Sequence, residues 1–345
     1  MKKVLVTGGC GYIGSHTVVD LLENGYDVVS ADNLSNSDGS LLSGIEKITG
    51  KKIRNHNVDL CDLDATKAVF KQEGPIIGVI HFAALKYVNE SVERPVDYHK
   101  NNLGSLLNII ECMKEFDVPH LVFSSSCSVY GDVEELPVQE FTPLGVAASP
   151  YARTKQIGEQ IIDDTISATK QKAVILRYFN PVGAHPSNLI GEKPFGSPQN
   201  LLPRIARSAL GELGTFVIAG NDYPTRDGTC IRDYVHVMDI AHAHTLALKY
   251  MDTQLEDGEI DIVNLGSGEG QSVKEMLDAF IEANKVDMSY EIGPRRPGDV
   301  TAIYSNSLKA QDNLGWRCKF DLHDMVKTAW AWESKLYSER NAEAN

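Results

Sequence analysis

The chain has 345 residues, which is long enough to bury a large core and predicts about two domains. Hydrophobic residues make up 42% of the sequence and charged residues 23%, a composition that excludes a disordered or fibrous protein. The net charge is −14, and an acidic surface repels phosphate backbones and anionic lipids. We therefore expect neither nucleic acid nor a membrane as a partner.

The cysteines are scattered through the chain and form no Cys-x-x-Cys pair. They are Cys10, Cys61, Cys112, Cys127, Cys230 and Cys318. This spacing favours neither a zinc site nor a disulfide framework, so we expect no metal and a reducing compartment. No run approaches the roughly 18 apolar residues of a membrane helix, and we expect a cytoplasmic protein.

Short apolar runs alternate with helical patterns through the first half of the chain. The runs that predict strands are Lys3–Thr7, Asp27–Ala31, Ile53–Val58, Ile77–Phe82, Leu121–Ser124 and Ala173–Tyr178. Tyr12–Asn24, between the first two runs, has apolar residues at helical spacing. Strands that alternate with helices predict an α/β fold, a doubly wound parallel-sheet Rossmann domain. Ligands of such sheets bind outside the carboxyl ends of the strands.

The composition of the sequence changes after Tyr178. Residues 180–200 are rich in Gly, Pro and Asn, which favours a loop, and Ser272-x-x-Glu275 predicts a capping box at the start of a later helix. We expect a boundary near residue 180. Residues 1–180 would form the Rossmann domain, and residues 181–345 a smaller mixed α/β domain, with some segments returning to the first domain.

Glycines mark the turn after the first predicted strand. Gly8, Gly11 and Gly14 form a Gly-x-x-Gly-x-x-Gly pattern between that strand and the first helix. Glycine lets the backbone turn tightly, approach a pyrophosphate closely and pack the helix against the strand. The free N–H groups of the helix start favour an anion. The pattern predicts a dinucleotide site, although a tight strand-to-helix turn alone would use the same residues.

Asp32 ends the second predicted strand, 18 residues after Gly14. This spacing is typical of a carboxylate that binds the ribose hydroxyls of a dinucleotide. It favours NAD, because a carboxylate repels the 2′-phosphate of NADP. The alternative is a turn role for Asp32 within Asp-Asn-Leu-Ser-Asn. Asp59, after the third run, is placed to reach the adenine.

A second candidate group combines hydroxyls with an amine. Tyr151 and Lys155 are four residues apart and share a helix face, and Ser149-Pro150 suits the start of that helix. Ser126 lies in a run of hydroxyl residues at the end of a predicted strand. A phenol has a pKa near about 10, and nearby positive charge lowers that pKa because it favours the phenolate. Lys155 and a nicotinium ring would together make Tyr151 a base.

The glycine pattern, Ser126 and Tyr151-x-x-x-Lys155 together resemble the extended branch of the short-chain dehydrogenase/reductase superfamily. Longer motifs narrow the resemblance to the UDP-glucose 4-epimerases. These motifs are His81–Lys86, Arg177–Pro186, Gly220–Thr229 and Arg232–Asp239. The resemblance extends from Lys3 to about Trp332, nearly the whole chain.

The resemblance implies a fixed NAD that oxidises a UDP-hexose at C4 and then reduces the 4-keto sugar from its other face. Tyr151 would exchange the C4 hydroxyl proton, Lys155 would hold the nicotinamide ribose and lower the pKa of Tyr151, and Ser126 would bind the C4 oxygen. The NAD-binding residues that it implies are Gly8, Gly11, Tyr12, Ile13, Gly14, Asp32, Asn33, Asn36, Asp59, Leu60, Phe82, Lys86, Asn101, Tyr151, Lys155 and Tyr178.

The same resemblance implies a UDP-sugar site that draws mainly on the second half of the chain. Arg232 and Arg296 would bind the diphosphate, and Asp299 the uridine ribose. The full set for the UDP-sugar is Lys86, Ser126, Tyr151, Tyr178, Asn180, Asn200, Leu201, Arg232, Tyr234, Arg296, Asp299 and Ile303. Gln199 stands where many members carry a second asparagine, a mild change because the amide is kept.

Ile303 lies four residues after Asp299, at the position that lines the sugar pocket in this family. A tyrosine there closes the pocket to all but plain hexoses, while a small side chain admits an N-acetyl group. Isoleucine is intermediate. We expect UDP-glucose and UDP-galactose to be the principal pair, and the alternative is an enzyme that also or mainly acts on UDP-GlcNAc and UDP-GalNAc.

Two other functions are less well matched. A sugar-nucleotide dehydratase of the same superfamily carries Asp-Glu after the catalytic serine, where this chain has Cys127 and Ser128. A non-catalytic dinucleotide sensor has no need of Tyr151, Lys155 and Ser126 together.

Members of the family are usually dimers, and on that ground we expect a homodimer. The resemblance implies pairing through the helices around Pro95–Phe116 and Tyr151–Ser167. Apolar positions of the first helix would serve either the core or this interface. They are Leu103, Leu106, Leu107 and Ile110.

Overall fold

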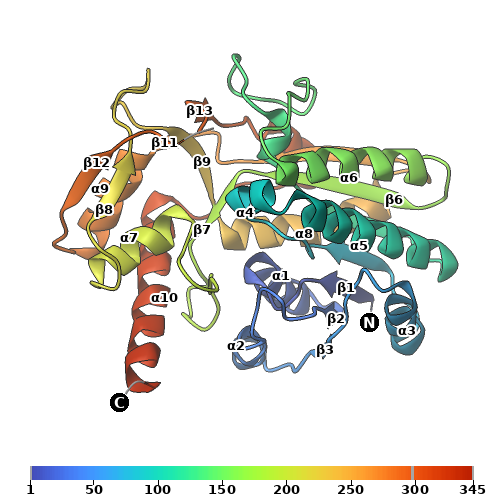
Figure 1. Cartoon of the computed structure of the whole chain (residues 1–345). Coiled ribbons are helices and arrows are strands. Elements are labelled where there is room, and N and C mark those ends of the chain that lie inside the picture. Colours follow the sequence, from blue (N-terminus) through green and yellow to red (C-terminus); the bar gives the residue numbers. More distant parts are fainter. Residues whose placement is uncertain (1, 297–298, 344–345) are drawn as a thin grey trace.

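A parallel sheet of seven strands organises the molecule (Figure 1). The computed structural model describes residues 2–296 and 299–343. The strand order is β10-β6-β5-β4-β1-β2-β3, and all the pairs are parallel. The strands are β1 (Lys3–Thr7), β2 (Asp27–Ala31), β3 (Arg54–His56), β4 (Gly78–His81), β5 (His120–Ser126), β6 (Lys172–Tyr178) and β10 (Ile260–Leu265).

Helices cover both faces of this sheet, because successive apolar residues of each strand point to opposite sides. Val4 and Val6 of β1 belong to one core cluster, whereas Leu5 belongs to another. The first face carries α1 (Tyr12–Glu23), α2 (Leu41–Thr49) and α8 (Val237–Thr253), and the second carries α3 (Leu63–Glu73), α5 (Pro95–Glu115) and α6 (Pro150–Ile166). The expectation of a doubly wound parallel sheet is confirmed.

All six predicted strands are present, with small or no shifts at their ends. β1 and β2 have the predicted bounds, β3 and β4 are shorter, and β5 is longer by one residue at its start and two at its end. The predicted helix after the glycines ends one residue early, at Glu23. β10 is a seventh strand that the apolar runs of the first half do not predict, because it follows much later in the chain, after residue 180.

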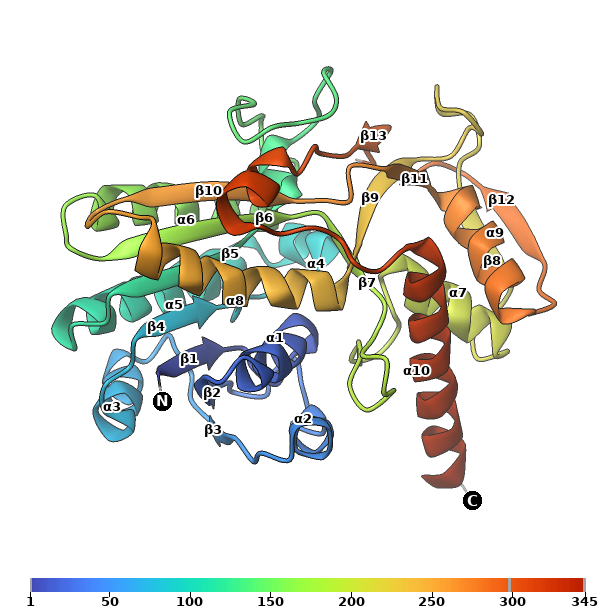
Figure 2. The ribbon, with the colours of Figure 1, turned by 180° about the vertical axis from the view of Figure 1, so that it is seen from behind.

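The remaining elements form a smaller unit beside the carboxyl ends of the strands (Figure 2). Its strands are β7 (Asn180–Val182), β8 (Phe216–Ala219), β9 (Ile231–His236), β11 (Gly270–Ser272), β12 (Tyr290–Gly293) and β13 (Ala302–Ile303). Its helices are α7 (Leu201–Ala209), α9 (Val273–Asn284) and α10 (Leu322–Glu343). β9 pairs with β7, β11 and β13, and β12 pairs with β8.

The packing of this unit is also mixed α/β. Its core brings α7, α9 and α10 together around residues such as Ile205, Phe280 and Val326, all fully buried. The predicted capping box is confirmed at α9, where Ser272 and Glu275 each accept a hydrogen bond from the other's backbone N–H. Short helical segments complete the chain: α4 (Val88–Glu93), a 3-10 turn at Cys127–Tyr130 and a π turn at Ala310–Leu314.

The chain returns to the seven-stranded sheet after it has entered the smaller unit. β9 leads directly into α8, which packs on α1, and β10 then pairs with β6 before the chain leaves again at β11. No helix within the described residues has the length and apolar character needed to cross a membrane.

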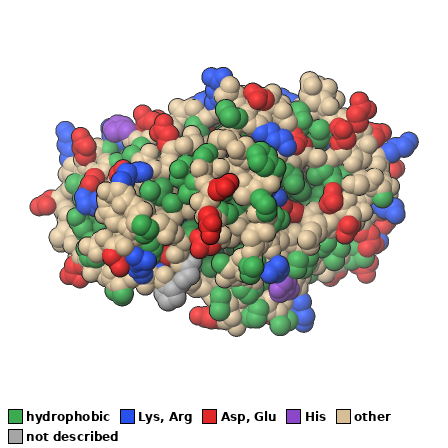
Figure 3. All heavy atoms as spheres, turned by 90° about the horizontal axis from the view of Figure 1, so that it is seen from above, with side chains coloured by type: hydrophobic (Ala, Val, Ile, Leu, Met, Phe, Trp, Pro, Cys, Tyr) green, Lys and Arg blue, Asp and Glu red, His purple; other side chains and the backbone are tan. Residues whose placement is uncertain are grey.

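Hydrophobic and charged side chains share the end of the molecule that Figure 3 views from above. Hydrophobic side chains gather in the middle of this face, and acidic and basic ones are interspersed around them. The loop between the 3-10 turn and α6 lies at this end and exposes Phe141 and Val146.

Candidate active site

A large cleft opens at the carboxyl ends of the central strands, with about 1110 Å³ of free volume that is partly open to solvent. Every residue predicted to bind the cofactor lines it, from the glycine turn to Tyr151, Lys155 and Tyr178. The further lining residues, which the sequence did not single out, are Ala31, Ser35, Ser37, Val58, Ala83, Ala84, Leu85, Ser105 and Ser124.

The glycine turn is packed too tightly for any side chain. Gly8 has φ +68°, and a Cβ on Gly14 would lie 2.2 Å from the Gly8 carbonyl oxygen. Gly11 precedes α1 without a side-chain cap, and the first turn of α1 carries no acidic residue. The N–H groups at this end of α1 therefore suit a phosphate, and the turn fits the pyrophosphate of a dinucleotide.

Asp32 combines the two roles that the sequence left open. Its carboxylate accepts hydrogen bonds from the backbone N–H of Cys10 at 3.0 Å and of Leu34 at 2.9 Å, so it shapes its own turn. It also lines the cleft beside Asn33 and Asn36. Burial raises the pKa of Asp32, while the two backbone hydrogen bonds oppose that rise. A carboxylate with unused lone pairs at this place suits two ribose hydroxyls.

Tyr151 and Lys155 project from the first turns of α6. The predicted helix start is confirmed: Ser149 caps the helix by accepting from Ala152 N at 3.2 Å, and Pro150 occupies the first position. Lys155 Nζ donates to the Ser124 carbonyl at 2.5 Å. This bond ties α6 to the end of β5.

The electrostatics of this pair are set by burial. Burial lowers the pKa of Lys155 to about 8, with Glu159 opposing the change. Its ammonium lies 4.9 Å from the ring centre of Phe123 and 5.9 Å from that of Tyr151. Burial raises the pKa of Tyr151 to about 12, while a hydrogen bond with Ser126 lowers it. The chain alone therefore shifts the pKa of Tyr151 upward, opposite to the expected decrease, because desolvation of the phenolate dominates.

Several predicted sugar contacts lie around the end of β5. Ser126 is the last residue of that strand, next to Tyr151, and its hydroxyl accepts from Ser128 N at 3.2 Å. The Tyr178 hydroxyl donates to Ser124 Oγ, which places the phenol beside the same strand end. Asn180 begins β7, and its side-chain Oδ1 is buried without a hydrogen-bond partner.

The predicted nucleotide contacts form a separate group on the smaller unit. Arg232 on β9 donates to the Asp299 carboxylate at 3.3 Å. Ile303 on β13 lies opposite Arg232 in the strand register. Ile303 is buried, whereas Arg296 is exposed. Both arginines and Asp299 act on the pKa of Tyr234, which burial raises. These five residues therefore lie close together. Two residues of the surrounding motif, Pro297 and Gly298, fall outside the described residues.

Asn200 and Leu201 stand at the start of α7, and Lys86 lies in the cleft. Glu192 links them: its carboxylate accepts from Asn200 Nδ2 at 2.6 Å and lies 3.5 Å from Lys86 Nζ. No local pattern predicts this buried glutamate, because it lies in a stretch whose composition favours a loop.

Known proteins match this chain over nearly its whole length. The family model described as GDP-mannose 4,6 dehydratase matches residues 5–329. UDP-glucose 4-epimerase uge1 of Schizosaccharomyces pombe is 48% identical, covering 96% of this chain and 94% of its own, and UDP-glucose 4-epimerase of Bacillus subtilis is 46% identical, covering 96% of each. The chain belongs to the UDP-glucose 4-epimerase family.

A solved structure of this epimerase family has the same fold. The enzyme from Stenotrophomonas maltophila, crystallised with NAD and formylated UDP-arabinopyranose, superimposes with a TM-score of 0.95 at 42% identity, covering 98% of this chain and all of its own. The cleft and the arginine group beside it therefore belong to a fold that this chain shares with the epimerase family.

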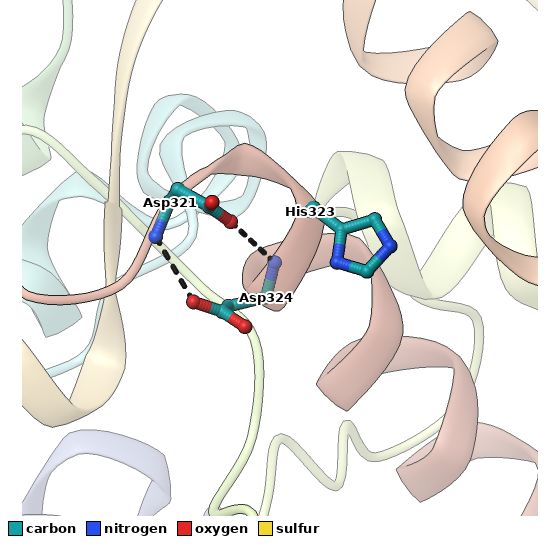
Figure 4. A group of neighbouring side chains, drawn as sticks. All are labelled: Asp321, His323 and Asp324. Atoms are coloured by element: carbon teal, nitrogen blue, oxygen red, sulfur yellow. Dashed lines mark hydrogen bonds between the residues drawn. The ribbon is translucent and has the colours of Figure 1, made fainter.

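One cluster of potential metal ligands lies away from the cleft of this epimerase-family chain (Figure 4). Asp321, His323 and Asp324 form the only such group within residues 2–296 and 299–343. Both carboxylates already accept backbone hydrogen bonds at the start of α10: Asp321 from Asp324 N at 2.9 Å, and Asp324 from Asp321 N at 3.2 Å. These bonds account for the cluster as a helix cap.

Proposed function

We propose that this protein catalyses the reversible, NAD-dependent epimerisation of a UDP-hexose at C4, with UDP-glucose and UDP-galactose as the principal pair and a 4-keto sugar as intermediate. The observation that carries the proposal is the meeting of Tyr151 and Lys155 in a cleft lined by a complete glycine cradle, with Ser126 next to Tyr151. The near full-length match to UDP-glucose 4-epimerases supports the same reaction.

Each of the three residues has a separate chemical task. Tyr151 removes the proton of the C4 hydroxyl and later returns it. Ser126, which lies next to the Tyr151 phenol, binds the C4 oxygen and aligns it with the phenol. Lys155 places a positive charge near the phenol, which favours the phenolate over the neutral form.

The cofactor that fits this cleft is NAD, and NAD supplies hydride acceptance and hydride return. The N–H groups around Gly11 and Ile13 would hold its pyrophosphate, and Asp32 its adenosine ribose. Asp59 and Leu60 line the same cleft next to Val58. Phe82, Lys86, Asn101 and Tyr178 complete the proposed set together with the tyrosine and lysine of α6.

Arginines suit the diphosphate of the second ligand. We assign this role to Arg232 and Arg296, because guanidinium groups bind phosphate oxygens in pairs. Asp299 would bind the uridine ribose, and the remaining contacts would come from Asn180, Asn200, Leu201, Tyr234 and Ile303. In the S. maltophila relative, the bound sugar nucleotide is a UDP-pentose derivative.

We further propose a cytoplasmic homodimer of chains divided near residue 180. Residues 1–180 would bind NAD and 181–345 the UDP-sugar, with α8 and β10 belonging to the first domain. Leu107 on α5 is 49% exposed and Leu103 is half-buried, whereas Leu106 and Ile110 are buried in the core, so Leu107 is the best placed of these four positions for a dimer interface. All six cysteines are free thiols, which suits a reducing compartment.

The test is to incubate the protein with UDP-galactose and follow UDP-glucose by chromatography. We expect conversion in both directions, and a loss of about 10²–10⁴-fold in Tyr151→Phe, which removes the general base. Tyr290→Phe, on half-exposed β12, is the matched control and should keep full activity.

Two outcomes would contradict the proposal. A clear preference for UDP-N-acetylgalactosamine over UDP-galactose would show that the acetylated sugars are the principal substrate pair. Ile303 would then be the first residue to test by mutation. A keto product that accumulates and absorbs in alkali would indicate a dehydratase, although Cys127 and Ser128 occupy the place of its acid–base pair.

A further inference from the structure

A buried ion pair lies directly behind the proposed catalytic groups. Glu159 of α6 and Arg177 of β6 are 5% and 3% exposed. Arg177 donates Nε to Glu159 Oε1 at 2.9 Å and Nη2 to Oε2 at 2.6 Å, a two-pronged contact. Removing two charges from water costs about as much free energy as their attraction returns. A gain in stability therefore does not by itself account for this ion pair.

The pair is joined to the strand that carries the active-site hydroxyls. Ser125 Oγ donates to Glu159 Oε1, and Ser125 lies between Ser124 and Ser126 on β5. The carbonyl of Ser124 accepts from Lys155, and the hydroxyl of Ser126 lies close enough to the Tyr151 phenol to lower its pKa. Glu159 thus holds Ser125, which lies between the two serines that are next to Lys155 and Tyr151.

Arg177 is itself fixed by further contacts. Its Nη1 donates to the Tyr130 hydroxyl at 3.0 Å and to the Glu140 carbonyl at 3.2 Å. Tyr130 in turn donates to Asn264 Oδ1 at 2.7 Å. The guanidinium has little freedom to turn away from Glu159, so the carboxylate stays in place as well.

The position of Glu159 also gives it an electrostatic effect. It lies one helical turn after Lys155, where residues four apart share a face. The other titratable groups that face Lys155 are Tyr151 on the same helix, Tyr178 on β6 and His81 on β4. Burial and the charge of Lys155 lower the pKa of His81 to about 3, so that histidine is neutral. α5 contributes the neutral side chains of Asn101 and Ser105 to the cleft.

We propose that Glu159 is a positioning residue for the epimerase reaction, which clamps the end of β5 through Ser125 and places a negative charge one helical turn from the ammonium of Lys155. The proposal rests on the roles assigned to Tyr151, Lys155 and Ser126 above. Glu159 touches neither sugar nor cofactor in this account and acts through its neighbours.

The first test is Glu159→Gln, which keeps the shape and loses the charge. Lys155 then loses the negative charge that favours its ammonium form, so its pKa falls and it gives up its proton at a lower pH than in the wild type. We expect the alkaline limb of kcat/KM to move down by at least about half a pH unit, about a threefold change in the protonation ratio. We expect kcat to fall while KM changes little, because no substrate contact is removed.

A second variant guards against simple misfolding. Glu159→Gln leaves Arg177 buried without a partner, whereas Glu159→Gln combined with Arg177→Met removes both charges. This double variant should show the same shift of the alkaline limb. Glu73→Gln is the matched control: Glu73 is a buried carboxylate paired with Arg54 at the end of α3, and its loss should leave the pH profile unchanged.

The outcomes separate this proposal from the proposed function. An active wild-type enzyme whose alkaline limb stays in place in both folded variants overturns the role of Glu159 alone. A wild-type protein that does not interconvert UDP-hexoses overturns the reaction and this inference with it. Folded variants with the limb shifted and KM retained support the positioning role, because a purely structural defect lowers the height of the profile without moving it.

Discussion

At the residue scale, the same physical cause acts on Tyr151 and Lys155 in opposite directions. Burial penalises the charged form of each group, so the pKa of the phenol rises to about 12 and that of the ammonium falls to about 8. Near pH 7 the lysine still carries its charge and the tyrosine is neutral. To act as the base proposed above, the tyrosine would need positive charge at its oxygen, and the sequence indicated this need without revealing how strongly burial opposes it.

The glycine cradle gives a prediction at the same scale. Gly14→Ala places a Cβ against the Gly8 carbonyl, so the strand and helix must separate. We expect the free energy of unfolding to fall by about 1–3 kcal/mol and NAD to be retained less well. Chemical denaturation and the nucleotide absorbance of the purified protein measure the two effects.

The control for this change is Gly214→Ala. Gly214 has an ordinary backbone angle and open space where the Cβ would go, so this variant should be as stable as the wild type. Equal losses in both variants would show that the tight turn is not what makes Gly14 necessary.

At the element scale, residues 183–200, between β7 and α7, connect the two units beside the cleft, and we call this segment the strap. Lys193 donates to Asp38 and, at 3.0 Å, to Ser40, both on the segment before α2. Trp332 of α10 donates Nε1 to the Glu192 carbonyl at 2.7 Å. The strap therefore connects the smaller unit to the dinucleotide side of the sheet.

Cutting one of these ties should loosen the hold on NAD. Lys193→Ala removes the link to Asp38, and we expect NAD to dissociate faster by up to about fivefold, because half-exposed ion pairs contribute about 1 kcal/mol at most. Dilution into NAD-free buffer with time-resolved nucleotide release measures this. Lys274→Ala removes an ion pair of similar exposure on α9 and should not change the rate.

The elements also show what sequence patterns could and could not reveal. Apolar runs predicted six of the seven sheet strands because a strand covered on both faces must be apolar throughout. Capping residues predicted the starts of α6 and α9, since each supplies its own hydrogen bond. Contacts such as Glu192 with Lys86 and Asn200 depend on how a loop folds over the sheet, which no local pattern encodes.

At the scale of the whole molecule, buried histidines make the fold sensitive to acid. Burial lowers the pKa of His16, His81 and His236 to about 3 and that of His244 to about 4. Their unfolded values lie near about 6.5. The unfolded chain therefore binds more protons below that pH, and stability present above it is lost as the pH falls.

We expect the free energy of unfolding to decrease by about 1.4 kcal/mol per pH unit for each of these histidines below about pH 6.5. Urea denaturation at pH 7, 6 and 5 measures the slope. His244→Leu should make the slope shallower because His244 packs between the rings of Phe82 and Tyr178, where no charge is supported. His323→Gln, at an exposed site, should leave it as it is; an unchanged slope in both variants would contradict the argument.

The strand order has a consequence for how the protein is made. The sheet is complete only when β10 pairs with β6, and the first face is covered only when α8 packs on α1. A ribosome synthesises β6 some eighty residues before β10, so the growing polypeptide carries an open apolar sheet edge for several seconds at about 5–20 residues per second. The cradle for NAD precedes both β6 and β10 in the chain, so the sheet beneath it is still incomplete when the cradle has been synthesised.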